Sequence, residues 1–231
     1  MAIPLYLAKN PWEFAQKNSC NENSAWMACR FSPSGAGLNH VPEQLPKNTL
    51  LILDDMIPPQ GHSINQVKTT LSHIAEKFSC PGILLDFQRP NNPESCEMIR
   101  SILTLSCPVI VSHIYAADLN CPIFLPPIPP WMIPEEYIKP WQNRNIWLEV
   151  AIQTQTLTIT DNGCRISECI YGESRDLPFH SENLCCHYGI DLSEKQALFT
   201  LNRNKSHISA LLNRLEQFGV KGCVGLYEDF K

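Results

Sequence analysis

Eight short apolar segments, set between turn residues and amphipathic stretches, are the feature that most limits what this chain can fold into. They are rich in Ile, Val and Leu and are bounded by Pro, Gly, Asn or Asp, which is typical of strands buried on both faces. The segments are residues 25–31, 49–54, 82–88, 108–114, 122–125, 145–151, 197–202 and 222–228. Strands that alternate with helices in this way predict a parallel sheet.

Three of the intervening segments have the period of an amphipathic helix. Residues 63–78 place Ile64, Val67, Leu71, Ile74 and Phe78 on one face, and Ser63 is suited to cap the first turn. Residues 93–105 and 206–218 repeat the pattern, and Gly219 is placed to end the last of them.

Eight strands in 231 residues favour a closed barrel over a doubly wound sheet. We therefore predict an irregular (β/α)8 TIM-type barrel, a single barrel domain over residues 1–231, with residues 1–14 packing outside it or closing one end. The connections 32–48 and 115–121 are too polar or too short for full outer helices. Segments 156–160 and 164–170 flank Asn162-Gly163, a strong turn signal, and predict a hairpin inserted after the sixth strand. The alternative is an open α/β sheet.

Composition excludes several classes of protein. The net charge is −5 with no basic run, so we expect no nucleic-acid partner. No apolar stretch reaches the ~20 residues needed to cross a bilayer, so no membrane span is expected. No Gly-rich phosphate loop follows any strand, and no secretory signal is visible at the N-terminus. These observations favour a cytoplasmic protein without a nucleotide cofactor.

The eleven cysteines have no CxxC spacing, and their number is odd. Several, such as Cys29, Cys80 and Cys223, lie in or beside apolar runs, where a thiol packs as a small hydrophobic group. Cys185, Cys186 and His187 form the one local cluster, but adjacent cysteines rarely share a tetrahedral ion. The sequence therefore predicts reduced, mostly structural thiols, no metal site and no cofactor.

Polar residues gather at the carboxyl ends of the predicted strands, where barrel enzymes build their sites. Asp86 and Gln88 end one strand, Asp54 and Asp55 another, and Glu149 a third. The full set of candidate site residues is Arg30, Asp55, Asp86, Gln88, Trp147, Glu149, Asn202, Tyr227 and Asp229. We expect these residues to converge on one mouth of the barrel.

Strand alternation separates side chains that face the lumen from those that face the helices. In the third predicted strand it turns Leu84, Asp86 and Gln88 inward. In the first it turns Arg30 inward and Met27, Cys29 and Phe31 outward. In the last it turns Val224 and Leu226 outward, and Cys223, Gly225, Tyr227 and Asp229 inward.

The segment PGILLDFQRP, residues 81–90, resembles the strand motif DGxDxDxE of the family 18 chitinase-like glycosidases, which are also eight-stranded barrels. Gly82 and Asp86 match this motif, Leu84 stands where an aspartate belongs, and Gln88 replaces the catalytic glutamate. The family motif closes the fourth strand, whereas this segment closes the third of the strands predicted above.

In that family the glutamate protonates the glycosidic oxygen, and the aspartate before it orients the acetamido group that attacks the sugar carbon. The resemblance gives Asp86 this second role, but an amide at position 88 cannot deliver a proton. Another carboxyl group would have to act as the acid, and Glu149 and Asp229 are the candidates.

Three functions stay open. The first is a glycoside-hydrolase-like enzyme with Asp86, Glu149 and Asp229 as catalytic residues. The second is a non-catalytic relative that binds a carbohydrate or another small polar ligand, where Arg30, Asp55, Gln88, Trp147, Asn202 and Tyr227 would make contacts. The third is a structural or protein-interaction component, for example one associated with spores, that has no active site.

Overall fold

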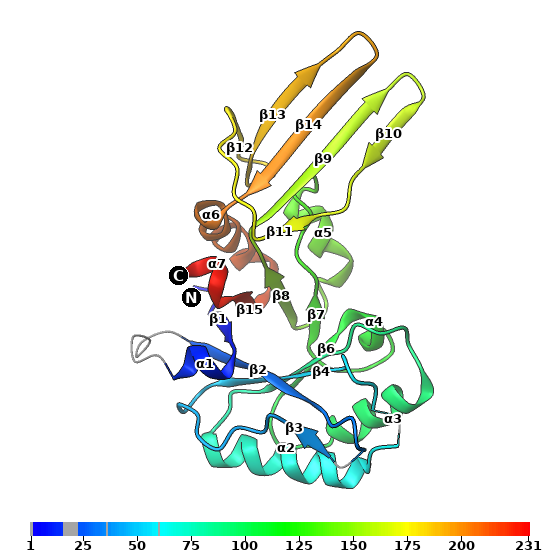
Figure 1. The fold of residues 1–231 in the computed structure, drawn as a ribbon, viewed down its shortest axis with the longest axis vertical. Coiled ribbons are helices and arrows are strands. Elements are labelled where there is room, and N and C mark those ends of the chain that lie inside the picture. Colours follow the sequence, from blue (N-terminus) through cyan, green and yellow to red (C-terminus); the bar gives the residue numbers. More distant parts are fainter. Residues whose placement is uncertain (1, 16–22, 36, 60) are drawn as a thin grey trace.

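The computed structural model describes residues 2–15, 23–35, 37–59 and 61–231. Eight parallel strands close into a barrel in the order β1-β2-β4-β5-β6-β7-β8-β15, and β15 pairs with β1 to complete the ring (Figure 1). The barrel strands are β1 (Leu5–Lys9), β2 (Ser24–Phe31), β4 (Leu50–Asp54), β5 (Ile83–Asp86), β6 (Val109–Ser112), β7 (Ile123–Leu125), β8 (Ile146–Val150) and β15 (Val220–Leu226). The two-residue strand β3 (Leu38–Asn39) pairs antiparallel with the end of β2. The predicted closed α/β barrel is confirmed.

The helical layer is uneven, as the sequence indicates. Its helices are α1 (Pro11–Phe14), α2 (Ile64–Phe78), α3 (Pro93–Ile102), α4 (His113–Ala116), α5 (Pro134–Ile138), α6 (Lys205–Leu215) and α7 (Tyr227–Phe230), with 3-10 turns at Lys139–Trp141 and Glu216–Phe218. The three predicted long helices are confirmed as α2, α3 and α6. Ser63 caps α2 by accepting the Gln66 N–H, and Gly219 ends the turn after α6 with φ +81°. None of the helices in the described ranges is long and apolar enough to cross a membrane.

Two strand assignments from the sequence are wrong. Residues 5–9, expected outside the barrel or across its end, form its first strand between β15 and β2. Residues 197–202, expected as the seventh barrel strand, belong instead to β14 (Gln196–Arg203) in a second sheet. Both segments are short and apolar, and residue type alone does not say which sheet an apolar strand joins, because that depends on pairing between distant segments.

The insertion follows residues 146–150, as predicted, but this strand is the seventh of the barrel and the insertion is larger than a hairpin. Its strands are β9 (Gln153–Thr160), β10 (Gly163–Ile166), β11 (Ile170–Tyr171), β12 (Phe179–Ser181), β13 (Cys186–Leu192) and β14. They form an antiparallel sheet in the order β10-β9-β14-β13-β12, with β11 also paired to β9. Two long hairpins of this sheet project away from the barrel (Figure 1).

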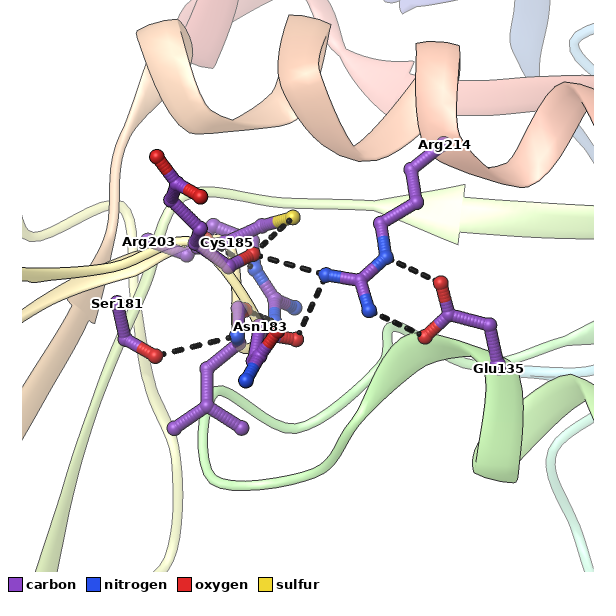
Figure 2. A network of polar contacts seen from close by, with 8 residues as sticks. Glu135, Ser181, Asn183, Cys185, Arg203 and Arg214 are labelled. Atoms are coloured by element: carbon purple, nitrogen blue, oxygen red, sulfur yellow. Dashed lines mark hydrogen bonds and ion pairs between the residues drawn. The ribbon is translucent and has the colours of Figure 1, made fainter.

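A polar network fastens the insertion to the barrel (Figure 2). Arg214 of α6 forms a two-pronged ion pair with Glu135 of α5 and donates to the carbonyls of Glu182 and Asn183. Next to it, the buried Arg203 donates through Nε to the Cys185 carbonyl at 3.1 Å and through Nη2 to the Leu184 carbonyl at 2.8 Å. The turn between β12 and β13 is therefore held from two sides.

Two layers of apolar side chains fill the barrel and separate it from the helices. The inner layer contains Leu84, Phe124 and Val224, and the outer layer contains Ile83, Leu85 and Phe87. The alternation predicted for β5 is therefore confirmed. In β2 a bulge between Trp26 and Cys29 turns Met27 toward the inner layer, against our expectation, whereas Cys29 and Phe31 lie in the outer layer as predicted.

The alternation predicted for the last strand is wrong. Val224 lies in the inner layer and Cys223 in the outer one, and the strand ends at Leu226. Cys223 and Val224 are both small and apolar, so their residue types do not indicate which of the two faces the lumen. A register shift between Val220 and Gly222 also interrupts the regular alternation of side chains along β15.

The ten cysteines that the structure describes form no disulfides with one another, and Cys20 lies outside the described residues. Burial raises the pKa of the Cys80 and Cys186 thiols to about 11, which disfavours the reactive thiolate. We expect mass spectrometry of native protein, alkylated without reductant, to find at most a minor fraction of cross-linked cysteines. Abundant disulfides of fixed pairing would contradict a structural role for the thiols.

Candidate functional site

A cavity of about 650 Å³ opens at the carboxyl ends of the barrel strands. We call it the mouth cavity. Its polar lining residues are Arg30, Asp54, Asp55, Asp86, Gln88, Arg89 and Glu149. Apolar side chains, including Met27, Phe124 and Leu226, form much of the rest. A concave site with apolar walls and a few converging polar groups is typical of small-ligand binding.

Three charged residues of the mouth cavity come from neighbouring strands in register. Arg30 of β2 lies opposite Asp54 of β4, which lies opposite Asp86 of β5. The Arg30 guanidinium pairs with Asp54 at 3.3 Å between Nη2 and Oδ2. Burial raises the pKa of the Asp54 carboxyl, although Arg30 and the Met56 N–H, 3.0 Å from Oδ1, favour its charged form. The Arg30 Nε is shielded from solvent and has no acceptor among the described residues.

Asp86 and Gln88 form a hydrogen-bonded pair on the lumen side of β5. The Gln88 amide donates through Nε2 to Asp86 Oδ1. Burial, together with the negative charges of Asp54 and Asp55, raises the pKa of Asp86, while the Gln88 bond acts in the opposite direction. Asp86 Oδ2 makes no hydrogen bond within the described ranges, so it is open to a ligand donor.

Glu149 of β8 brings a further carboxyl group to the mouth cavity. Burial raises its pKa to about 7, helped by the negative charges of Asp86 and Asp229. Glu149 makes no hydrogen bond or ion pair with another described residue that would hold it charged. Near neutral pH a large fraction of Glu149 therefore carries a proton, as a general acid requires.

Asp55 lines the mouth cavity, but its carboxylate is engaged by the backbone. Its Oδ1 accepts the Gln88 N–H at 2.8 Å and its Oδ2 accepts the Arg89 N–H at 3.0 Å. Arg89 returns a bond of 2.7 Å from Nε to the Asp55 carbonyl. Asp55, only 2% exposed, therefore holds the loop after β5 in place and supports the positions of Asp86 and Gln88.

Four of the predicted site residues lie outside the mouth cavity. Trp147 points into the lumen but packs deeper, against Tyr6 and against Gly222, where any Cβ would meet its ring at 2.6 Å. Asn202 is buried in the insertion, where it donates to Thr154 and Glu173. Tyr227 begins α7, and its ring lies 4.5 Å from the Lys9 ammonium. Asp229, also in α7, accepts the Ile152 N–H at 3.2 Å. The expectation that all the candidates meet at one mouth is wrong for these four.

Asp54, which is absent from the predicted site residues, presents its carboxylate to the mouth cavity beside Arg30, whereas two backbone N–H groups bind the carboxylate of Asp55. Leu51 and Leu53 of β4 lie in the outer apolar layer, so alternation turns Leu50, Ile52 and Asp54 inward. The alternation that turns Asp86 of β5 toward the lumen also turns Asp54 of β4 toward it.

Within the described residues no three His, Cys, Asp or Glu side chains are arranged to hold a metal ion.

Comparison with solved structures finds the same fold in spore cortex-lytic enzymes and in a chitinase. The spore cortex-lytic enzyme SleL of Bacillus megaterium superposes with a TM-score of 0.57 at 8% identity, over 96% of this chain and 70% of that chain. SleL of Bacillus cereus gives 0.56 at 10% identity, with the same coverage. A chitinase of Chromobacterium violaceum gives 0.57 at 11% identity, over 99% of this chain and 95% of that one. No protein-family model and no curated protein sequence matches the chain. At these identities the likeness shows a shared fold, and the predicted resemblance to chitinase-like barrels is confirmed at that level.

Because residues 5–9 form the first barrel strand, every later strand is counted one place higher, and this includes the strand within residues 81–90. Counted from β1, the strand β5 that carries Asp86 is the fourth of the barrel. The chitinase-like motif closes the fourth strand, so the mismatch expected from the sequence disappears. Asp86 ends this fourth strand, and Gln88 follows two residues later.

Proposed function

We propose that the mouth cavity binds a glycan that contains N-acetylated amino sugars and does not cleave it by the chitinase-like route. The observation that carries this proposal is the Asp86–Gln88 pair, which lies inside the mouth cavity at the end of the fourth barrel strand. Asp86 is placed to accept the N–H of an acetamido group. Gln88 can donate and accept hydrogen bonds but has no proton to give to a glycosidic oxygen.

The rest of the mouth cavity fits such a ligand. Apolar walls from Met27, Phe124 and Leu226 suit the C–H faces of a sugar ring. The Arg30 side chain lines the mouth cavity and is 30% exposed, so its guanidinium can donate to a ligand oxygen. The fold shared with a chitinase and with spore cortex-lytic enzymes supports a glycan over other small polar ligands.

Binding should depend on Asp86. We expect calorimetry to detect binding of an oligosaccharide of N-acetylated amino sugars to the wild-type chain. Asp86→Asn should weaken that binding about 10- to 100-fold, because it removes a charged acceptor that faces the ligand. The exposed Asp191 in the insertion gives a matched control, Asp191→Asn, which should leave the affinity unchanged. Absence of binding to every such oligosaccharide would overturn the proposal.

One observation favours hydrolysis as a second candidate function. Glu149 shares the mouth cavity with Asp86 and has a pKa raised to about 7, so it could supply the proton that Gln88 cannot. Under this candidate, activity is present below pH 7 and falls as the pH rises through the pKa of Glu149.

A further inference from the structure

The insertion sheet has one apolar face that is open to solvent. Pairing places Leu157 of β9 opposite Phe199 of β14, and Phe199 opposite Ile190 of β13. Because cross-strand partners point to the same side, these residues share a face. We define the apolar face by its members, which are Leu157, Ile159, Tyr188, Ile190, Leu192 and Phe199.

Several apolar side chains of this face are exposed to solvent, although a sheet usually buries its apolar side chains. Ile159, Ile190 and Leu192 are 43%, 39% and 78% exposed. On the opposite, more polar face, Leu177 and Pro178 lie against Gly189, and the Glu173 carbonyl accepts bonds from the sheet. A sheet normally covers its apolar face and leaves its polar face to water. Among the described residues, no second layer covers Ile159, Ile190 and Leu192 on this side of the insertion.

The apolar face has a cavity at one end of β13, beside Tyr188, and an exposed side chain, Leu192, at the other end of the same strand. A cavity of about 300 Å³ lies at its base, lined by residues that include Trp131, Tyr188 and Phe199. Leu192, the most exposed large apolar residue described, lies toward the hairpin tip. Tyr188 and Leu192 are four residues apart on β13, a distance of roughly 14 Å, and Ile190 is midway between them.

We propose that two copies of this chain associate through the apolar face. A two-fold axis that passes between the Ile190 side chains of the two copies would seat Leu192 of each copy in the hollow beside Tyr188 of the other. Such a self-complementary contact is the commonest form of homodimer interface, and sheets pack face to face in this way in β-sandwiches.

Area and charge favour a second copy over a membrane surface. The largest apolar patch of a monomer is typically about 300 to 600 Å², so two copies that cover such a patch would bury about 600 to 1,200 Å², near the lower limit for a specific interface. The hairpin ends around it carry Asp161, Asp191 and Glu194 against Lys195. An anionic bilayer would repel this excess of negative charge.

The test is the mass of the full chain in solution, measured by sedimentation equilibrium between about 1 and 100 μM, the range in which weak interfaces dissociate. We expect the wild type to form a dimer within this range. Leu192→Asp and Ile190→Asp should each raise the dissociation constant at least about 100-fold, as loss of a buried anchor does. Gln196→Asp is the matched control, since Gln196 is an exposed residue that pairs with Thr160 on the opposite face of the same sheet. It should leave the dimer intact.

Three results would overturn the proposal. The first is a wild type that stays monomeric at 100 μM, which needs no variant and so does not depend on variant folding. The second is a dimer that persists in both the Leu192 and the Ile190 variants. The third is equal dissociation by Gln196→Asp, which would assign the effect to added charge and not to the apolar face.

Discussion

Replacing Gln88 by glutamate should give this chain a hydrolytic activity toward amino-sugar oligosaccharides that the wild type lacks. The new carboxyl would lie in the mouth cavity beside Asp86, whose negative charge raises a neighbouring carboxyl pKa toward the range of a general acid. A positioned acid contributes about 10²- to 10⁴-fold to a rate. We therefore expect Gln88→Glu to cleave a chromogenic amino-sugar substrate at least about 100-fold faster than the wild type.

The gain should depend on Asp86 and on pH. In the Gln88→Glu background, Asp86→Asn should abolish the new activity, because it removes the group that orients the acetamido nucleophile. The rate should fall as the pH rises through the pKa of the new glutamic acid, since only the protonated form can donate. The control is Gln142→Glu, the same change at an exposed glutamine outside the mouth cavity, and it should add no activity.

The same assay separates the two candidate functions. If the wild type already hydrolyses the substrate, Gln88 is not a block, and Glu149→Gln should remove that activity if Glu149 is the acid. Asp229→Asn tests the remaining carboxyl from the sequence prediction, although its bond to the Ile152 N–H indicates a structural role. If the wild type binds the oligosaccharide and Gln88→Glu gains no activity, the assignment of position 88 as the acid position is wrong.

Loss of Arg203 should cause the largest change in stability. This guanidinium is 1% exposed and donates to the carbonyls of Ile128, Leu184 and Cys185, which belong to the loop after β7 and to the turn before β13. Arg203→Ala would remove the side-chain donor of the Leu184 and Cys185 carbonyls inside the protein, while the Ile128 carbonyl would keep its bond from Gln153 Nε2. We expect it to lower the free energy of unfolding by about 3 kcal/mol and Tm by roughly 6 to 12 °C for a chain of this length.

Two further variants make the stability test specific. Arg203→Lys should recover little, because one ammonium group cannot reproduce the planar fork that reaches three carbonyls. Arg175→Ala removes an exposed arginine that pairs with Glu173 at 2.8 Å, and it should change the unfolding free energy by less than about 1 kcal/mol. Similar melting curves for Arg203→Ala and Arg175→Ala would contradict the role given to Arg203.

Local patterns along the chain were enough to predict the long helices and the position of the Asp86–Gln88 pair. Helical periodicity fixed α2, α3 and α6, because an amphipathic period and its caps are encoded within one segment. Strand alternation placed Asp86 and Gln88 on the lumen side, because Ile83, Leu85 and Phe87 are apolar at every second position. The single-domain organisation over residues 1–231 and the cytoplasmic location stay predictions.

Which strands share a sheet, and which polar groups face the mouth cavity, depend on contacts between distant segments. Residues 5–9 and 197–202 are both short apolar strands, and pairing partners far along the chain put the first in the barrel and the second in the insertion. Asp54 and Asp55 are both acidic strand ends, yet the loop after β5 engages the carboxylate of Asp55 through two backbone N–H groups, while Asp54 pairs with Arg30 in the mouth cavity. Such long-range contacts have no signature within a local segment, because register and hydrogen-bond partners are set by what packs against the segment and not by its own residues.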